Sequence, residues 1–177
     1  MSQASKYVQW CLLKAEKETK EGKKKGQRNP KHRGLLKVNQ NKVMAIEYIN
    51  KSAENLNFAL SLDISLHGHI AISSLFYSMC HCFLAIASKF GYESRNQTCT
   101  ISLMEYLKEE KKIEIDNKFI EMFKYKEDQK EKGEFSLIEM REDYTYGAKT
   151  SIDKEIIKEL VQDCRKLIEE TKLMVHS

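Results

Sequence analysis

The segment 69–90 limits the possible folds of this chain more than any other part of the sequence. Nearly every position in it is apolar or small, including Ile70, Ala71, Ile72, Leu75, Phe76, Met79, Phe83, Leu84 and Ile86. A helix that is hydrophobic on all sides must be covered on all sides by other elements. We therefore expect a long helix here, closed by Gly91, in the middle of a helical bundle.

Composition favours an all-α fold around this helix. The 177 residues include one proline and seven glycines, and 32% of them are charged. Such a chain favours long helices over the short strands of a sandwich or barrel, and its length suits one compact domain, 1–177, with a sizeable core. We expect an antiparallel up-and-down four-helix bundle with additional short helices.

Apolar spacing and capping residues predict the other elements. The second helix, beginning after Asn39 or Asn41, has the strongest amphipathic pattern, with Val43, Ile46, Ile49, Ala53, Leu56 and Leu60 at spacings of three and four. Segment 22–40 holds three glycines and the only proline, which indicates a loop. Residues 1–40 are thus expected to be a helix plus a loop, and 41–177 the bundle. The remaining helices are expected over 7–21, 101–111, 117–131, 134–146 and 153–175.

The sequence predicts a cytoplasmic protein without membrane contact. Uninterrupted apolar stretches are only a few residues long, short of the roughly 20 that a membrane-spanning helix needs. Charged residues near the N-terminus occupy the place of a signal peptide's apolar stretch. The cysteines are odd in number and contain no CxxC, so we expect small buried residues and no disulfide framework. They are Cys11, Cys80, Cys82, Cys99 and Cys164.

Positive charge is concentrated in one segment, 22–33, which we call the basic loop. It has no acidic residue, whereas the rest of the chain carries 24 basic against 26 acidic residues, so the net charge of +4 arises here. Such a loop can neutralise phosphates of RNA or DNA, or attract an acidic partner; a solvated loop explains the charge equally well. Its cations are Lys23, Lys24, Lys25, Arg28, Lys31 and Arg33.

The sequence Cys80-His81-Cys82 suggests a metal site, but helical geometry argues against one. Adjacent residues on a helix point about 100° apart, so the three side chains do not converge on one ion. We predict no metal. The chain also lacks the patterns GxxxxGK[ST], GxGxxG, GxSxG and HExxH, and no cofactor is predicted.

Two polar residues, His81 and Arg141, occupy positions that core packing explains least well. His81 continues a polar row with Ser74 and Tyr77 on the apolar helix, either as a core histidine with partners or as a proton-transfer group in a groove. Arg141 shares a helix face with Tyr144. It either pairs with an acid on a neighbouring helix, since Glu142 and Asp143 should point elsewhere, or contacts the phosphate of a nucleotide.

These residues lie in two segments that resemble the HEPN domain. The run HGHIAISSLFYSMCHCFLAIASKFG is followed by FSLIEMREDYTYG and a long last helix, and the resemblance covers roughly 41–175. In small prokaryotic HEPN proteins the central helix reads Ser-Arg-x-Tyr-Tyr-Ala-Met-x-His, and the later helix reads Leu-Arg-x-x-Ala-Asp-Tyr. Arg141 matches the later arginine, Tyr144 or Tyr146 lies near its tyrosine, and Ser74 replaces the central arginine. The central pattern falls on Ser73, Phe76, Tyr77, Ser78, Met79 and His81.

The resemblance implies a helical bundle, commonly a homodimer with a shared cleft and often paired with a nucleotidyltransferase in a toxin–antitoxin module. In HEPN ribonucleases a histidine follows the arginine after four to six intervening residues. Here Tyr146, Gly147 and Ala148 occupy those positions, so the catalytic histidine is missing. A tyrosine, with a pKa of about 10, is a poor general base.

The leading hypothesis is a HEPN-type protein that binds nucleotide or RNA phosphate through Arg141, Tyr144, Tyr77 and the basic loop. One alternative is a metal-independent endoribonuclease in which Arg141 stabilises the phosphorane. His81 and Tyr146 would be its other catalytic residues. A second alternative is a module that docks a nucleotidyltransferase without chemistry.

Overall fold

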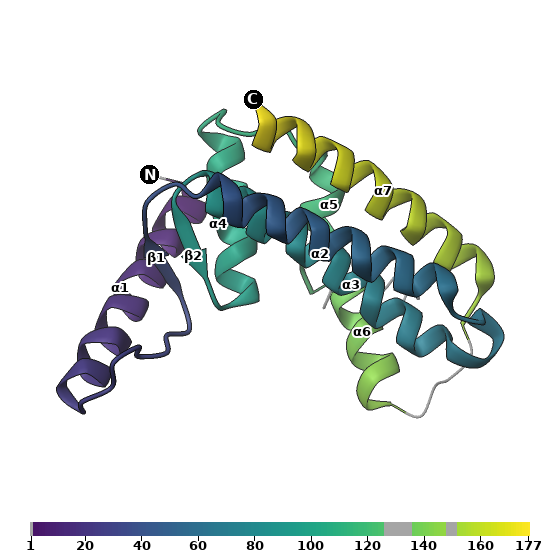
Figure 1. Cartoon of the computed structure of the whole chain (residues 1–177), viewed down its shortest axis with the longest axis horizontal. Coiled ribbons are helices and arrows are strands. Elements are labelled where there is room, and N and C mark those ends of the chain that lie inside the picture. The colour runs from purple at the N-terminus through teal and green to yellow at the C-terminus, as the bar shows by residue number, and fades with distance from the viewer. Residues whose placement is uncertain (1, 126–135, 148–151) are drawn as a thin grey trace.

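The computed structural model describes residues 2–125, 136–147 and 152–177, and these are mostly helical (Figure 1). The prediction of an all-α protein is confirmed, although two short strands also occur. The elements in chain order are α1 (Gln3–Lys24), β1 (Leu35–Lys37), α2 (Lys42–Ser61), α3 (Ile64–Lys89), β2 (Tyr92–Ser94), α4 (Gln97–Glu109), α5 (Asn117–Glu121), α6 (Leu137–Tyr146) and α7 (Lys154–His176).

Helix α3 is the central element, as its apolar circumference predicts. It contacts α2, α4, α6 and α7, and its apolar side chains are largely buried. Asp63 caps its N-terminus, and Gly91, at φ +76°, follows its end at Phe90. Because only two residues separate α2 from α3, these helices run antiparallel.

Helix α7 completes a layer of three long helices. Its C-terminal end meets the start of α2, where Lys42 Nζ lies 3.5 Å from the His176 carbonyl oxygen, and the end of α3, where Lys89 Nζ lies 3.5 Å from that of Val175. It therefore runs parallel to α3 and antiparallel to α2. The three helices lie side by side in Figure 1.

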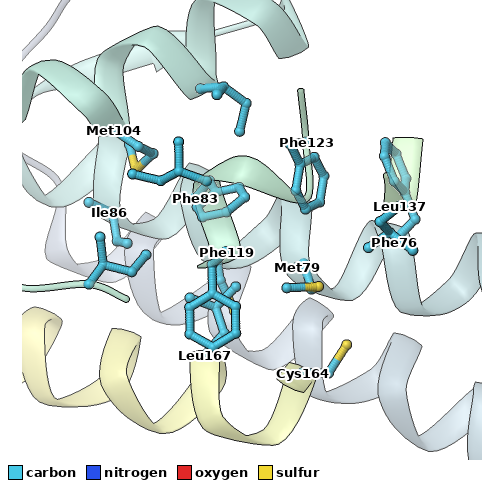
Figure 2. Close-up of a cluster of buried hydrophobic side chains, with 14 of the residues drawn as sticks. Phe76, Met79, Phe83, Ile86, Met104, Phe119, Phe123, Leu137, Cys164 and Leu167 are labelled. Carbon is cyan, nitrogen blue, oxygen red and sulfur yellow. The ribbon is translucent and has the colours of Figure 1, made fainter. Parts of the chain in front are cut away.

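Shorter elements cover the opposite side of α3. Figure 2 shows Phe76, Met79 and Phe83 of α3 among side chains of α4, α5 and α6. Phe123, just after α5, packs against Phe76 and Phe83 with ring centroids 5.1 Å apart in both pairs. The helix predicted over 117–131 ends at Glu121, and 126–131 lies outside the described residues. Helix α1 is similar in length to α2, α3 and α7 but packs mainly on α4 and β1, outside their layer. The four-helix bundle therefore stays a prediction.

Helix α3 also has the length and hydropathy of a membrane span. We did not predict this from the sequence, because we considered only uninterrupted apolar stretches. Helix α3 is the one such helix within the described residues. Most of it is buried against other helices, which is typical of the core helix of a globular protein.

Helix α2 starts after Asn41, one of the two predicted caps, and buries Ile49 and Leu56 of the predicted stripe, but the buried stripe is shifted. Val43 and Leu60 are exposed. The buried positions repeat every seven residues and include small side chains, which let α2 approach α3 closely. Ser52 there donates a hydrogen bond of 2.7 Å to the Ser78 carbonyl oxygen. The buried stripe consists of Ala45, Ile49, Ser52, Leu56 and Ala59.

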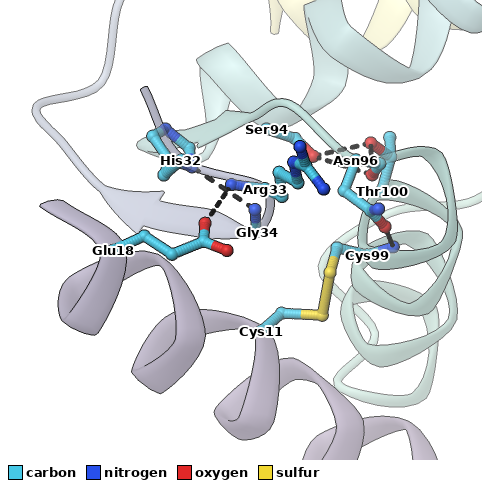
Figure 3. Close-up of a disulfide and its surroundings, with 9 residues drawn as sticks. All are labelled: Cys11, Glu18, His32, Arg33, Gly34, Ser94, Asn96, Cys99 and Thr100. Carbon is cyan, nitrogen blue, oxygen red and sulfur yellow. Dashed lines mark hydrogen bonds between the residues drawn. A yellow bond between two sulfur atoms is a disulfide. The ribbon is translucent and has the colours of Figure 1, made fainter. Parts of the chain in front are cut away.

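The N-terminal segment is joined to the rest of the chain by two features that the sequence analysis missed. Strand β1 lies in the predicted loop and pairs with β2 in antiparallel register, with Leu35 opposite Ser94. Cys11 of α1 forms a disulfide with Cys99 of α4 (Figure 3). The expectation of no disulfide is therefore wrong, because these cysteines are 88 residues apart and no sequence pattern brings them together. Disulfides are rare in the cytosol, so cytoplasmic localisation stays a prediction.

Replacing both Cys11 and Cys99 by serine should lower the free energy of unfolding by about 2–4 kcal/mol, because the cross-link restricts the unfolded chain. Urea unfolding with and without dithiothreitol measures this. The reductant should destabilise the wild type and the control variant Cys80→Ser, but not the double variant. Equal midpoints for oxidised and reduced wild type would contradict the prediction.

Candidate functional site

A pocket of about 350 Å³ lies where α3, the start of α4 and α6 meet, and we call it the Arg141 pocket. Helix α3 contributes Tyr77 and His81 to its wall, the segment after β2 contributes Arg95 to Gln97, and α6 contributes Arg141. The structure therefore brings together His81 and Arg141, the two residues that packing explained least well.

Arg141 is held on α6 by a helix start with strong local determinants. Ser136 caps α6 and forms a capping box with Glu139, each side chain bonding to the other residue's backbone N–H. This reciprocal capping satisfies two N–H groups that a helix N-terminus leaves free. It orients the first turns of α6, so that Arg141 extends over α3.

The guanidinium of Arg141 is largely buried against aromatic rings. Its side chain is 15% exposed, and Cζ lies 4.9 Å from the ring centroid of Phe76 and 5.8 Å from that of Tyr146. Nη2 lies 3.6 Å from Glu142 Oε1, which also accepts a 2.7 Å hydrogen bond from the Tyr125 hydroxyl. Glu142 was expected to point elsewhere. That expectation is wrong, because the long side chains of these adjacent residues bend toward each other.

Two buried donors at this pocket have no hydrogen-bond acceptor within the described part of the chain. They are Nε of Arg141 and Nε2 of Gln97. Leaving a buried donor unpaired costs about 1–3 kcal/mol, and more for a charged group. Both atoms are covered by neighbouring atoms, so these two donors do not themselves face the pocket.

The start of α4 adds further positive potential. Asn96 caps the helix by accepting a 2.9 Å hydrogen bond from the Cys99 N–H, and both Asn96 and Gln97 line the pocket. A helix N-terminus carries partial positive charge and favours anions. Arg95 contributes a full charge beside it; its side chain is 49% exposed and its Nε donates to Glu93 Oε1 at 2.7 Å.

His81 is a half-buried neutral imidazole. Asn55 Nδ2 donates to the Lys51 carbonyl oxygen at 2.8 Å and lies 3.2 Å from His81 Nδ1. The amide of Asn55 therefore packs against the Nδ1 edge of the imidazole. Burial lowers the pKa of His81 and the charge of Lys51 lowers it further, whereas a backbone hydrogen bond with Tyr77 acts in the opposite direction.

The other predicted tyrosines have different environments. Tyr77 lines the Arg141 pocket and is 48% exposed. Tyr146 is 79% exposed and contributes one face of its ring to Arg141. Tyr144 is partly buried and packs against the hydrophobic core.

Most of the basic loop lies away from this pocket, although its end returns to β2, where His32 Nε2 lies 3.4 Å from Glu93 Oε1. The loop follows the far end of α1, which Figure 1 shows at the opposite side of the molecule from α6. Its cations are exposed, and the backbone N–H of Arg33 donates to Glu18 (Figure 3). The lysines that directly follow α1 in this loop and Arg141 therefore do not form one binding surface, because the fold separates segments whose charges the sequence analysis had combined.

Cys80, His81 and Cys82 do not converge on one point, and only Cys80 and His81 line the same pocket. Cys80 lines the Arg141 pocket, whereas Cys82 is buried 3.2 Å from Ser52 Oγ at the α2 interface. Burial raises the pKa of the Cys82 thiol to about 11. Within the described ranges no group of three His, Cys, Asp or Glu side chains could hold a metal ion.

Comparison with known proteins finds no matching family model and no significantly similar curated protein. The resemblance to the HEPN domain therefore depends on the two quoted motifs, and membership of that family stays a hypothesis.

Arg95, Asn96 and Gln97 are the pocket residues that sequence reasoning missed. They precede the helix that we expected over 101–111, although Asn96 is a strong helix-capping residue. A capping residue preceded by arginine and followed by an apolar helix could have suggested an anion-binding helix N-terminus.

The unfolding free energy should fall as the pH decreases below about 6.5, the ordinary histidine pKa. Because the folded-state pKa of His81 is lowered, the unfolded chain takes up a proton first, and the loss ends once the pH passes the folded-state pKa. Urea unfolding between pH 7.5 and 5 should show a smaller fall in the unfolding free energy for His81→Gln than for the wild type.

In an NMR titration, Lys51→Gln should raise the pKa of His81, because it removes a nearby positive charge. A wild-type His81 pKa at or above 6.5 would contradict the lowered pKa.

Proposed function

We propose that this protein is a HEPN-type helical protein that binds a nucleotide or an RNA phosphate in the Arg141 pocket. The observation that carries the proposal is that Arg141 and Arg95 line one pocket together with Gln97 at the N-terminus of α4. The guanidinium groups and the helix N-terminus favour an anionic oxygen group in this pocket.

The remaining walls of the pocket favour a nucleotide over a bare inorganic anion. Tyr77 supplies exposed aromatic surface next to the cationic end, and the buried Phe76 and Phe123 lie beneath it. Bases stack on aromatic rings, and phosphates pair with the planar guanidinium of arginine. A ligand with a flat apolar part and an anionic part matches both sides of the cavity.

The finer features of the proposal come from the HEPN resemblance. They are a four-helix bundle, a homodimer with a shared cleft, and pairing with a nucleotidyltransferase in a cytoplasmic toxin–antitoxin module. In this scheme the basic loop, remote from Arg141, would contact a second stretch of phosphates or the partner protein.

Metal-independent RNA cleavage is the alternative that one observation favours, namely that His81 lines the same pocket as Arg141. A neutral imidazole with a lowered pKa is in the form needed to accept a proton from a ribose 2′-hydroxyl. Arg141 would stabilise the negative charge that develops on the phosphorane. Tyr146, exposed beside Arg141, would help to position the phosphate.

Replacing Arg141 by alanine should weaken RNA binding about tenfold or more, because a hydrogen-bonded charge contributes about 1.5–3 kcal/mol. Fluorescence anisotropy with a labelled single-stranded RNA at 50–200 mM salt measures this, and the wild-type affinity should fall steeply with salt. Arg165→Ala, an exposed arginine on α7, is the matched control and should bind normally. Unchanged affinity in Arg141→Ala would refute the assignment.

If the alternative is correct, the purified protein should cleave RNA in EDTA, and His81→Ala should abolish cleavage because the base is lost. The control His176→Ala changes an exposed histidine at the end of α7. Absence of cleavage across varied RNAs, with binding retained, would rule out the ribonuclease and leave the binding function.

A further inference from the structure

A second cavity of about 520 Å³ adjoins the Arg141 pocket, and we call it the Tyr92 pocket. It lies between the start of α2, the end of α3 and β2. Leu84, Ser94 and Arg95 line both cavities. Since the two pockets share these walls, they form neighbouring parts of one surface. Each has a volume within the range of about 300–1,000 Å³ typical of small-ligand sites.

Arg95 is the cation at the junction between the two pockets. Its Nε donates to Glu93 Oε1, which anchors the side chain and uses one of the five N–H donors of the guanidinium. Glu93 is itself close to the buried His32, whose Nε2 lies 3.4 Å from the same oxygen. Glu93 therefore holds the half-exposed Arg95 guanidinium in place, and the other N–H groups of the guanidinium can contact a ligand oxygen.

Aromatic side chains lie on both sides of Arg95. Tyr77 lines the Arg141 pocket, and Tyr48 and Tyr92 line the Tyr92 pocket. His81 connects the two groups, since it lines the Arg141 pocket while its ring stacks on Tyr48 with centroids 6.0 Å apart and planes 21° apart. Lys51 adds positive charge 5.8 Å from the Tyr48 ring centroid.

This alternation of aromatic rings and cations along adjoining pockets is how proteins bind single-stranded nucleic acids, with bases stacked on rings and the backbone near positive charge. We infer that the ligand is a single strand of at least two nucleotides that occupies both pockets, with a backbone phosphate at Arg95. This inference rests on the proposed phosphate site at Arg141. It adds the Tyr92 pocket as a second nucleotide subsite.

The experiment compares two probes, adenosine 5′-monophosphate and a hexameric oligoadenylate, by isothermal titration calorimetry on the full chain. The hexamer should bind at least about tenfold more tightly, because it alone fills both pockets. Tyr92→Leu, which changes only the Tyr92 pocket, should weaken the hexamer about tenfold and change the affinity for the mononucleotide less than twofold. Arg95→Ala removes a charge that lines both pockets, so it should weaken both probes, the hexamer more than the mononucleotide. Arg95→Lys and Tyr92→Phe, which keep the charge or the ring, should retain most of the hexamer affinity.

Arg28→Ala, in the basic loop, is the charge-matched control for Arg95→Ala and should affect the hexamer less. Thermal unfolding of each variant checks that the fold is retained. If both probes bind equally and Arg141→Ala weakens both, the second subsite is refuted and the proposed function stands. If neither probe binds, or Arg141→Ala leaves both affinities unchanged, the proposed function fails and the inference fails with it.

Discussion

The structure depends on the burial of α3, whose apolar side chains project in all directions. Water has to be excluded from every side of this helix, and no single neighbour can do so. Helices α2 and α7 cover one side over their full lengths, and α4, α5 and α6 cover the other in short pieces. The arrangement of the remaining elements follows from this requirement.

The Arg141 pocket arises where that second covering is incomplete. Short elements meet at an angle on α3 and leave a cavity between them, whereas the long antiparallel contact with α2 is closely packed through Ser52 and Ser78. Arg141 reaches over Phe76 at the edge of the cavity. Burial makes the guanidinium strongly dependent on acceptors, and this dependence is why the pocket is the best candidate for an anion site.

The N-terminal segment contributes to the site indirectly. The Cys11–Cys99 disulfide attaches α1 to the first turns of α4, and pairing of β1 with β2 supports the strand that leads to Arg95 (Figure 3). Both connections converge on the segment that carries Asn96 and Gln97. The 1–40 segment therefore braces one wall of the pocket, although its charged loop lies elsewhere.

The sequence by itself determined the helical class, the central place of α3 and several helix ends, because periodicity and capping are local properties of neighbouring residues. It also singled out Arg141 and His81, whose polarity contradicts their apolar surroundings. Only the tertiary structure decided which face of α2 is buried, that Cys11 meets Cys99, and that Arg95 and Gln97 join Arg141. These outcomes depend on close contacts between residues distant in sequence, which composition and residue spacing do not predict.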